Sequence, residues 1–88
     1  MEKRIGTALI IVDDKSEIEK LNKYIGFHSD IIISRQGLPL KDRTNNLISL
    51  IYEGTTDEIG ALTGKIGRLK GIRIKSLVIK NSIAEEVS

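Results

Sequence analysis

The sequence predicts an α+β fold in which two helices cover one face of a four-stranded antiparallel sheet. Four segments are rich in β-branched residues and alternate like strands, and two others repeat their apolar residues at helical spacing. Along the 88-residue chain their order is strand, helix, strand, strand, helix, strand. This order is the split βαβ, or ferredoxin-like, arrangement. We expect strands near residues 4–13, 29–36, 45–53 and 71–80, and helices near 15–25 and 56–69.

The first strand has two apolar faces. One face carries Gly6, Ala8, Ile10 and Val12, and the other carries Thr7, Leu9 and Ile11. A strand with this pattern is expected at the centre of the sheet. Asp13 and Asp14 mark the turn that follows, and either carboxylate can cap the next helix.

The first helix is predicted from its apolar stripe, and the ends of this helix and of the second strand are predicted from glycine and proline residues. Ile18, Leu21 and Ile25 form the buried stripe of the helix, with Tyr24 at its edge. Gly26 is expected to end this helix in the left-handed conformation. Phe27 and His28 then lead into the second strand. The sequence Gly37-Leu38-Pro39 is expected to end that strand, because proline has no N–H group to donate to a ladder.

The second half of the chain begins with a polar connection at residues 41–45 and a third strand at 46–53. Thr55 and Glu58 then have the spacing of a capping box. The helix that follows has an apolar stripe formed by Ile59, Leu62, Ile66 and Leu69. Gly71 should stop this helix before the fourth strand. We therefore expect one domain over residues 1–80 and a polar C-terminal tail over 81–88.

Apolar residues on both faces of the sheet predict a partner. The first three strands carry them on both faces, and the fourth changes phase between Ile74 and Leu77. Two helices cover only one face, so a second copy of the chain is the simplest cover for the other. We expect a homo-oligomer, either a dimer or a tetramer.

Composition excludes several classes of protein. The chain has no Cys, which rules out disulfides, thiolate catalysis and Cys-based metal sites. It has no apolar run near the ~20 residues of a membrane span, and Ala8–Val12 is too short for a signal peptide. We therefore expect a cytoplasmic protein that does not enter a membrane.

Motifs for catalysis and cofactors are also missing. His28 is the single His, whereas a transition-metal site needs several His or Cys ligands. No Ser stands in a G-x-S-x-G frame, and Glu17 and Glu19 should point to different sides of their helix. We therefore expect no cofactor, no metal and no enzymatic activity. Three aromatic residues outside any RNA-binding motif give no reason to expect direct nucleic-acid binding.

Charge and glycine are unevenly placed in the last third. Between Ile59 and Ala84 there is no acidic residue, and the six basic residues are Lys65, Arg68, Lys70, Arg73, Lys75 and Lys80. They form either a solvated rim or a surface for an anion or a partner. Gly60, Gly64 and Gly67 cluster within about 60° on the helical wheel, at a combined cost of about 2–3 kcal/mol relative to Ala. They are either tolerated on a solvated face or form a surface that another chain or ligand approaches closely.

The last third also carries a family resemblance. The segment IGALTGKIGRLKGIRIKS (59–76), the opening Glu2-Lys3-Arg4, the strand Asp30-Ile31-Ile32 and the pattern Arg35-x-Gly37-x-Pro39 are similar to the iron-only hydrogenase system regulators. That family comprises small, stand-alone bacterial proteins. The resemblance implies an ACT-like fold that also resembles the C-terminal domain of the nickel-responsive repressor. Two departures argue against nickel and amino-acid sensing: the repressor's His and Cys ligands are missing, and Lys15-Ser16 replaces an Asp-x-x-Gly turn.

These observations lead to a ranked set of functions. The first is a non-enzymatic regulatory module, an ACT-like homo-oligomer that senses a small ligand or docks on a protein partner. The second is a transcriptional regulator that contacts DNA through its basic edge, and the third is a small enzyme. The candidate ligand or interface residues are Gly60, Gly64, Gly67, Lys65, Arg68, Arg35 and Gly37.

Overall fold

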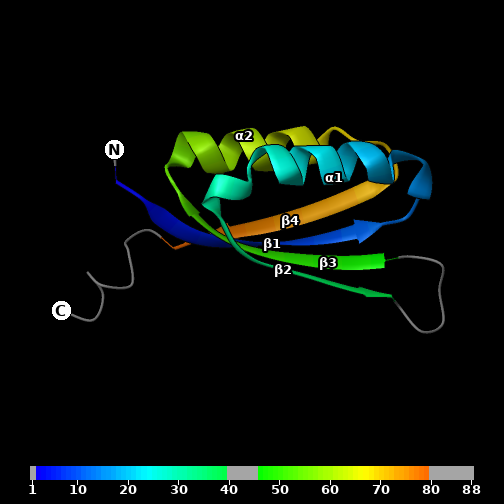
Figure 1. Cartoon of the computed structure of the whole chain (residues 1–88), viewed down its shortest axis with the longest axis horizontal. Coiled ribbons are helices and arrows are strands. Elements are labelled where there is room, and N and C mark those ends of the chain that lie inside the picture. Colours follow the sequence, from blue (N-terminus) through cyan, green and yellow to red (C-terminus); the bar gives the residue numbers. More distant parts are fainter. Residues whose placement is uncertain (1, 40–45, 80–88) are drawn as a thin grey trace.

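The computed structural model describes residues 2–39 and 46–79, and its elements follow the predicted order (Figure 1). The predicted connection at 41–45 and the predicted tail at 81–88 lie outside the described residues. None of the described helices is long and apolar enough to cross a membrane. The elements are β1 (Arg4–Val12), a 3-10 turn (Lys15–Glu17), α1 (Ile18–Phe27), a second 3-10 turn (Ser29–Ile31), β2 (Ile32–Pro39), β3 (Asn46–Gly54), α2 (Thr56–Gly67) and β4 (Ile72–Val78).

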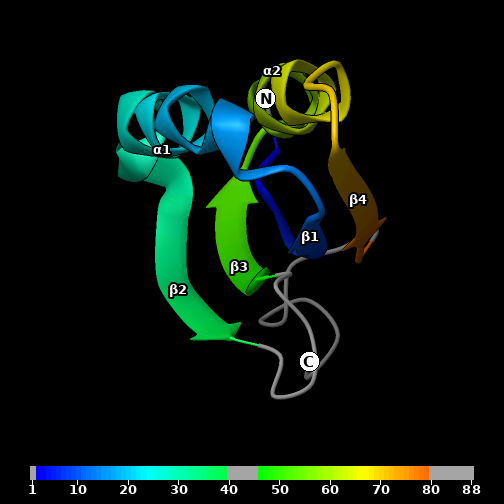
Figure 2. The same ribbon diagram turned by 90° about the vertical axis from the view of Figure 1, so that its right-hand side faces the viewer.

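The four strands form one antiparallel sheet in the order β2-β3-β1-β4. Both helices lie on the same face of this sheet, as Figures 1 and 2 show. The predicted ferredoxin-like, ACT-like architecture is therefore confirmed. The central position expected for β1 is confirmed too, because β1 pairs with β3 on one side and β4 on the other.

The core lies between the sheet and the two helices. Alternate residues of β1 and β3 face the helices, because successive side chains of a strand point to opposite faces. The largest fully buried side chains are Tyr52, Ile10, Leu21, Leu50, Leu62, Ile66 and Val12. No described polar or charged residue is buried with them. Of the two helical stripes read from the sequence, Leu21, Ile25, Ile59, Leu62 and Ile66 are buried in this core, whereas Ile18 and Leu69 are only partly buried.

The second helix begins where the capping box predicted. The Glu58 backbone N–H donates to Thr55 Oγ1 (3.2 Å), and the Thr55 N–H donates to Glu58 Oε1 (2.8 Å). These hydrogen bonds hold the pKa of Glu58 below its ordinary value. The helix ends at Gly67, two residues earlier than predicted, and Leu69 packs partly buried against the core just beyond it.

The first helix differs from the prediction at both ends. Asp14 accepts from the Ser16 N–H (2.9 Å), which caps a 3-10 turn rather than the α-helix itself. The helix then runs through Gly26 to Phe27, so the expectation that Gly26 ends it was wrong. Among the described residues only Gly71 has a positive φ. One glycine costs a helix about 1 kcal/mol, and here the helical hydrogen bonds continue to the His28 N–H, which donates to the Tyr24 carbonyl (3.2 Å).

The second strand also differs from the prediction. It begins at Ile32 and continues to Pro39, whereas the strand was expected to span 29–36 and to stop at Gly37-Leu38-Pro39. β2 is an edge strand, and proline is tolerated on an edge. Near its start, the register against β3 shifts between Ile32 and Ser34. This bulge at Ile33 decides which later residues of β2 face the helices.

Candidate functional site

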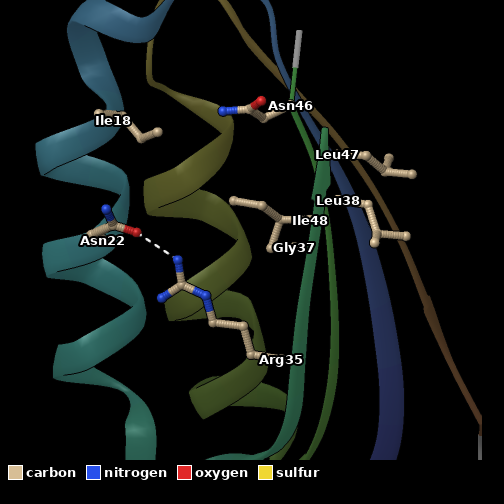
Figure 3. A pocket seen from close by; sticks show the side chains of 8 residues that line it. All are labelled: Ile18, Asn22, Arg35, Gly37, Leu38, Asn46, Leu47 and Ile48. Carbon is tan, nitrogen blue, oxygen red and sulfur yellow. Dashed lines mark hydrogen bonds between the residues drawn. The ribbon is translucent and has the colours of Figure 1, made fainter. Parts of the chain in front are cut away.

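A cleft opens between α1 and the edge of the sheet on the helix-covered face (Figure 3). We call it the Arg35 cleft, and its volume is about 250 Å³. Leu38 and Leu47 border it with their backbones, but Figure 3 shows their side chains on the opposite side of the strands. The side chains and the glycine that line the cleft are Ile18, Asn22, Arg35, Gly37, Asn46 and Ile48.

The bulge at Ile33 places Arg35 and Gly37 in the cleft. Arg35 pairs with Leu50 and Gly37 with Ile48, and these partners on β3 both face the helices. From β2 the Arg35 side chain reaches across to α1, where its Nη2 donates to Asn22 Oδ1 (2.7 Å; Figure 3). The two β2 candidates from the sequence, Arg35 and Gly37, are thus brought together in one cleft.

Two residues of the cleft were not among the sequence candidates. Asn22 lies on α1 one turn after Ile18, and Asn46 begins β3. An amide side chain on a helix or at a strand end is usually a surface residue, so the sequence did not predict either asparagine as part of a site. The only available signal was the spacing of four residues between Ile18 and Asn22, which places them on one side of the helix.

A second candidate surface is the side of the sheet that no described element covers, which we call the open sheet face. Its central residues remain largely accessible, with Leu9 at 48%, Ile51 at 44% and Leu77 at 68% exposure. A shallow hollow of about 340 Å³ crosses it between β3 and β4. The apolar side chains of this face are Ile5, Leu9, Ile11, Leu38, Leu47, Ile51, Leu77 and Ile79.

The glycines of α2 form a third, separate surface. All three are exposed, and a Cβ at Gly60 or Gly64 would meet nothing within 4 Å. Gly67 adjoins β4, since a Cβ there would lie 3.7 Å from Ile74 Cγ2. No described residue therefore accounts for these glycines, and their contact with another chain or ligand stays a prediction.

Lys65 turns away from the glycines toward α1. Its Nζ lies 3.3 Å from His28 Nε2, 4.7 Å from the centre of the Phe27 ring and 5.9 Å from that of Tyr24. Burial, together with the Lys65 charge, lowers the pKa of His28 below 6.5, against the opposing charges of Asp30 and Glu58. Of the two basic candidates in this helix, Lys65 and Arg68, Lys65 therefore contacts α1.

Replacing Lys65 with Met should raise the pKa of His28 toward 6.5. The substitution removes the Lys65 charge, which is one of the two main causes of the lowered pKa, and leaves the other cause, burial, in place. A 1H NMR titration of the single His measures this directly. Since the folded-state pKa is depressed, the neutral His28 stabilises the fold above pH 6.5, and that contribution is lost as pH falls through the folded value. Lys70→Met is the matched control, and an equal shift in both variants would contradict the assignment.

The basic residues of the last third do not all lie on one surface. Arg73 makes a bidentate pair with Asp13, with Nε at 2.7 Å from Oδ2 and Nη2 at 3.0 Å from Oδ1. Lys75 lies near it on the open sheet face, whereas Lys65 lies between the helices. Lys80 is outside the described residues. In the described ranges, no three of His, Cys, Asp or Glu gather as a metal site would require.

Comparison with known proteins places this geometry in a family. The profile described as "TM1266-like: Iron-only hydrogenase system regulator, putative" matches residues 4–76. The structure of uncharacterized protein TM1266 from Thermotoga maritima superimposes with a TM-score of 0.84 and 32% identity, over 90% of this chain and 100% of that one. No curated protein matches the sequence.

More distant structures share only the fold. The C-terminal domain of the MgtC protein from Mycobacterium tuberculosis has a TM-score of 0.66 at 10% identity, over 88% of both chains. Prephenate dehydratase from Streptococcus mutans has a TM-score of 0.58 at 16% identity, over 88% of this chain and 42% of that one. The family profile spans every element from β1 into β4, and the chain therefore belongs to the TM1266-like family.

Proposed function

We propose that the chain is a non-enzymatic regulatory module that works as a homodimer, or as a dimer of dimers, paired through the open sheet face. In this role it responds to a small ligand or docks on a protein partner within an iron-only hydrogenase system. Membership of a regulator family and the ACT-like fold support the regulatory role. The observation that carries the proposal is the open sheet face, because monomers rarely expose a large contiguous apolar patch.

The geometry of this face suits a second copy. Ile51, Thr7 and Leu77 form a continuous row across β3, β1 and β4, since Thr7 pairs with both of the others. Leu9 lies in the neighbouring row, between Ser49 and Lys75. A two-fold axis would place an apolar row against its own copy, with the polar groups of Lys75 and Ser49 beside it.

A charge at the centre of the face should separate the copies. We expect the wild-type chain to sediment as a dimer or tetramer at tens of micromolar, and Ile51→Glu to sediment as the 9.8 kDa monomer. The substitution should weaken pairing by about 100-fold or more, because two like charges would meet across the interface. Ile51 is partly exposed in the single chain, so the fold should tolerate the glutamate.

Phe27→Glu is the matched control, since Phe27 is a large apolar residue of α1 that is 74% exposed and lies away from the sheet face. It should leave the pairing intact. Gly64→Ala tests the glycine surface of α2: it should weaken tetramers if the glycines meet another copy, and otherwise raise the melting temperature alone. A wild-type monomer, or an Ile51→Glu variant that remains paired, would contradict the proposal.

A further inference from the structure

We propose that the Arg35 cleft binds a small organic acid that carries one carboxylate and a short aliphatic group. This inference rests on the proposed function, since it names the class of ligand to which the regulatory module responds. It is argued from the charge, the hydrogen bonding and the shape of the cleft. The open sheet face takes no part in it, because the two surfaces lie on opposite sides of the sheet.

The polar end of the cleft suits a carboxylate. Arg35 is exposed, and its Nη2 donates one hydrogen bond to Asn22 Oδ1 at 2.7 Å. A guanidinium has five N–H donors, so others remain for a ligand, and two parallel N–H bonds match the two oxygens of a carboxylate. The bond to Asn22 also holds the flexible arginine across the cleft before a ligand arrives, which lowers the entropy lost on binding. Asn46 adds a second amide at the wall.

The rest of the cleft suits a short aliphatic group. Ile18 from α1 and Ile48 from β3 supply branched aliphatic walls. Gly37 leaves the floor open, because a Cβ at this position would meet nothing within 4 Å. The volume of about 250 Å³ lies below the roughly 300–1,000 Å³ of pockets for drug-sized molecules. The ligand is therefore a small molecule rather than a nucleotide or a peptide.

The charges of the residues that line the cleft favour binding of a carboxylate over binding of other anions or amino acids. The described lining residues include one cationic side chain and no acidic one. A single guanidinium neutralises one negative charge and would leave the second charge of a phosphate unpaired, which is costly to desolvate. The ammonium of an amino acid would find no carboxylate partner among the described lining residues, and desolvating an unpaired charge is costly.

Four probes test this ligand class with the full chain. Isovalerate carries the carboxylate and the aliphatic group, isovaleramide is its neutral isostere, valine adds an ammonium, and inorganic phosphate supplies charge without the aliphatic group. Amide chemical shifts in 1H-15N NMR spectra are followed during each titration. We expect saturable, millimolar-range binding of isovalerate, with shifts at Asn22, Arg35, Gly37 and Ile48, and at least about tenfold weaker binding of the other three.

Three variants locate the binding. Arg35→Met should weaken isovalerate binding by about tenfold or more by removing the charged donor. Gly37→Val should abolish it by filling the floor, and it should leave the fold intact because a Cβ at this position would meet nothing within 4 Å. Arg68→Met removes an exposed arginine outside the cleft and should bind isovalerate like the wild type. The melting temperature of each variant confirms that it is folded.

The outcomes separate this inference from the proposed function. Absence of saturable shifts with isovalerate, or unchanged binding by Arg35→Met or Gly37→Val, would overturn the carboxylate site. Tighter binding of phosphate or valine than of isovalerate would overturn the ligand class. Sedimentation of the same samples reports the pairing of chains independently, so a dimer that fails to bind isovalerate refutes the cleft and leaves the proposed assembly standing.

Discussion

Replacing Gly71 with Ala is expected to lower the free energy of unfolding by about 3 kcal/mol. Gly71 has φ of 69°, in the left-handed region, which costs a residue with a Cβ about 1–2 kcal/mol. The added Cβ would overlap Asp14 Cβ and lie 3.2 Å from both Asp14 N and Asp14 Cα. The Gly71 carbonyl accepts from the N–H groups of Asp13 (2.7 Å) and Asp14 (3.0 Å), so relieving the overlap disturbs these bonds as well.

Thermal and denaturant unfolding measure this effect. For a domain of this size, a loss of about 3 kcal/mol corresponds to a fall in melting temperature of more than about 12 °C. Gly26→Ala is the matched control, because Gly26 lies inside α1 and an added Cβ would meet nothing within 4 Å. It should stabilise the chain by up to about 1 kcal/mol. If Gly71→Ala is as stable as the wild type, the turn does not require glycine.

Replacing Tyr52 with Ala is expected to cost about 3–5 kcal/mol, the largest effect of any single side chain considered. Tyr52 on β3 is fully buried, and its hydroxyl donates to the Thr7 carbonyl (3.1 Å). Its ring lies across Gly6 on β1, where a Cβ would come within 2.6 Å of Tyr52 Cε1 and 2.8 Å of the Leu77 carbonyl oxygen. Because Gly6 has no side chain, the Tyr52 ring can occupy the space where a Cβ would otherwise lie.

A double-mutant cycle checks this packing. Gly6→Ala alone should cost about 1–3 kcal/mol through overpacking. In the Tyr52→Ala background the same change should cost less, because the ring that the methyl would meet is gone. Tyr52→Phe, which keeps the ring, should cost only about 1 kcal/mol for the lost hydrogen bond. Additive free energies in the cycle would show that the ring and Gly6 do not share this space.

The fold could be predicted because its main signals are local. The spacing of Ile59, Leu62 and Ile66 places them on one side of a helix whatever surrounds it, and all three are buried. The capping box at Thr55 involves residues three apart and forms as predicted. Gly71 was expected to end the second helix, but α2 ends at Gly67, and Gly71 with its positive φ lies in the turn before β4.

The candidate site was predicted less completely, because it depends on residues far apart in the sequence. Arg35 and Gly37 were singled out from a pattern of residues, without any sign of what they face. Asn22 joins them only because α1 crosses beside β2, thirteen residues away along the chain. Lys65 illustrates the same limit: its position in the helix was clear, whereas its contact with His28 depends on how the two helices pack.

The sequence by itself determined the order of the elements, the buried faces of β1 and α2, and the presence of a second apolar face on the sheet. Each of these follows from the period of side chains along one element, which the backbone geometry sets. Only the tertiary structure decided the register of β2. A strand that alternated without interruption from Ile32 would turn Arg35 to the open sheet face, because a shift of one residue reverses every later side chain. The bulge at Ile33 arises from pairing with β3, which residues nearby in the sequence do not encode, and it turns Arg35 and Gly37 toward α1 to form the cleft.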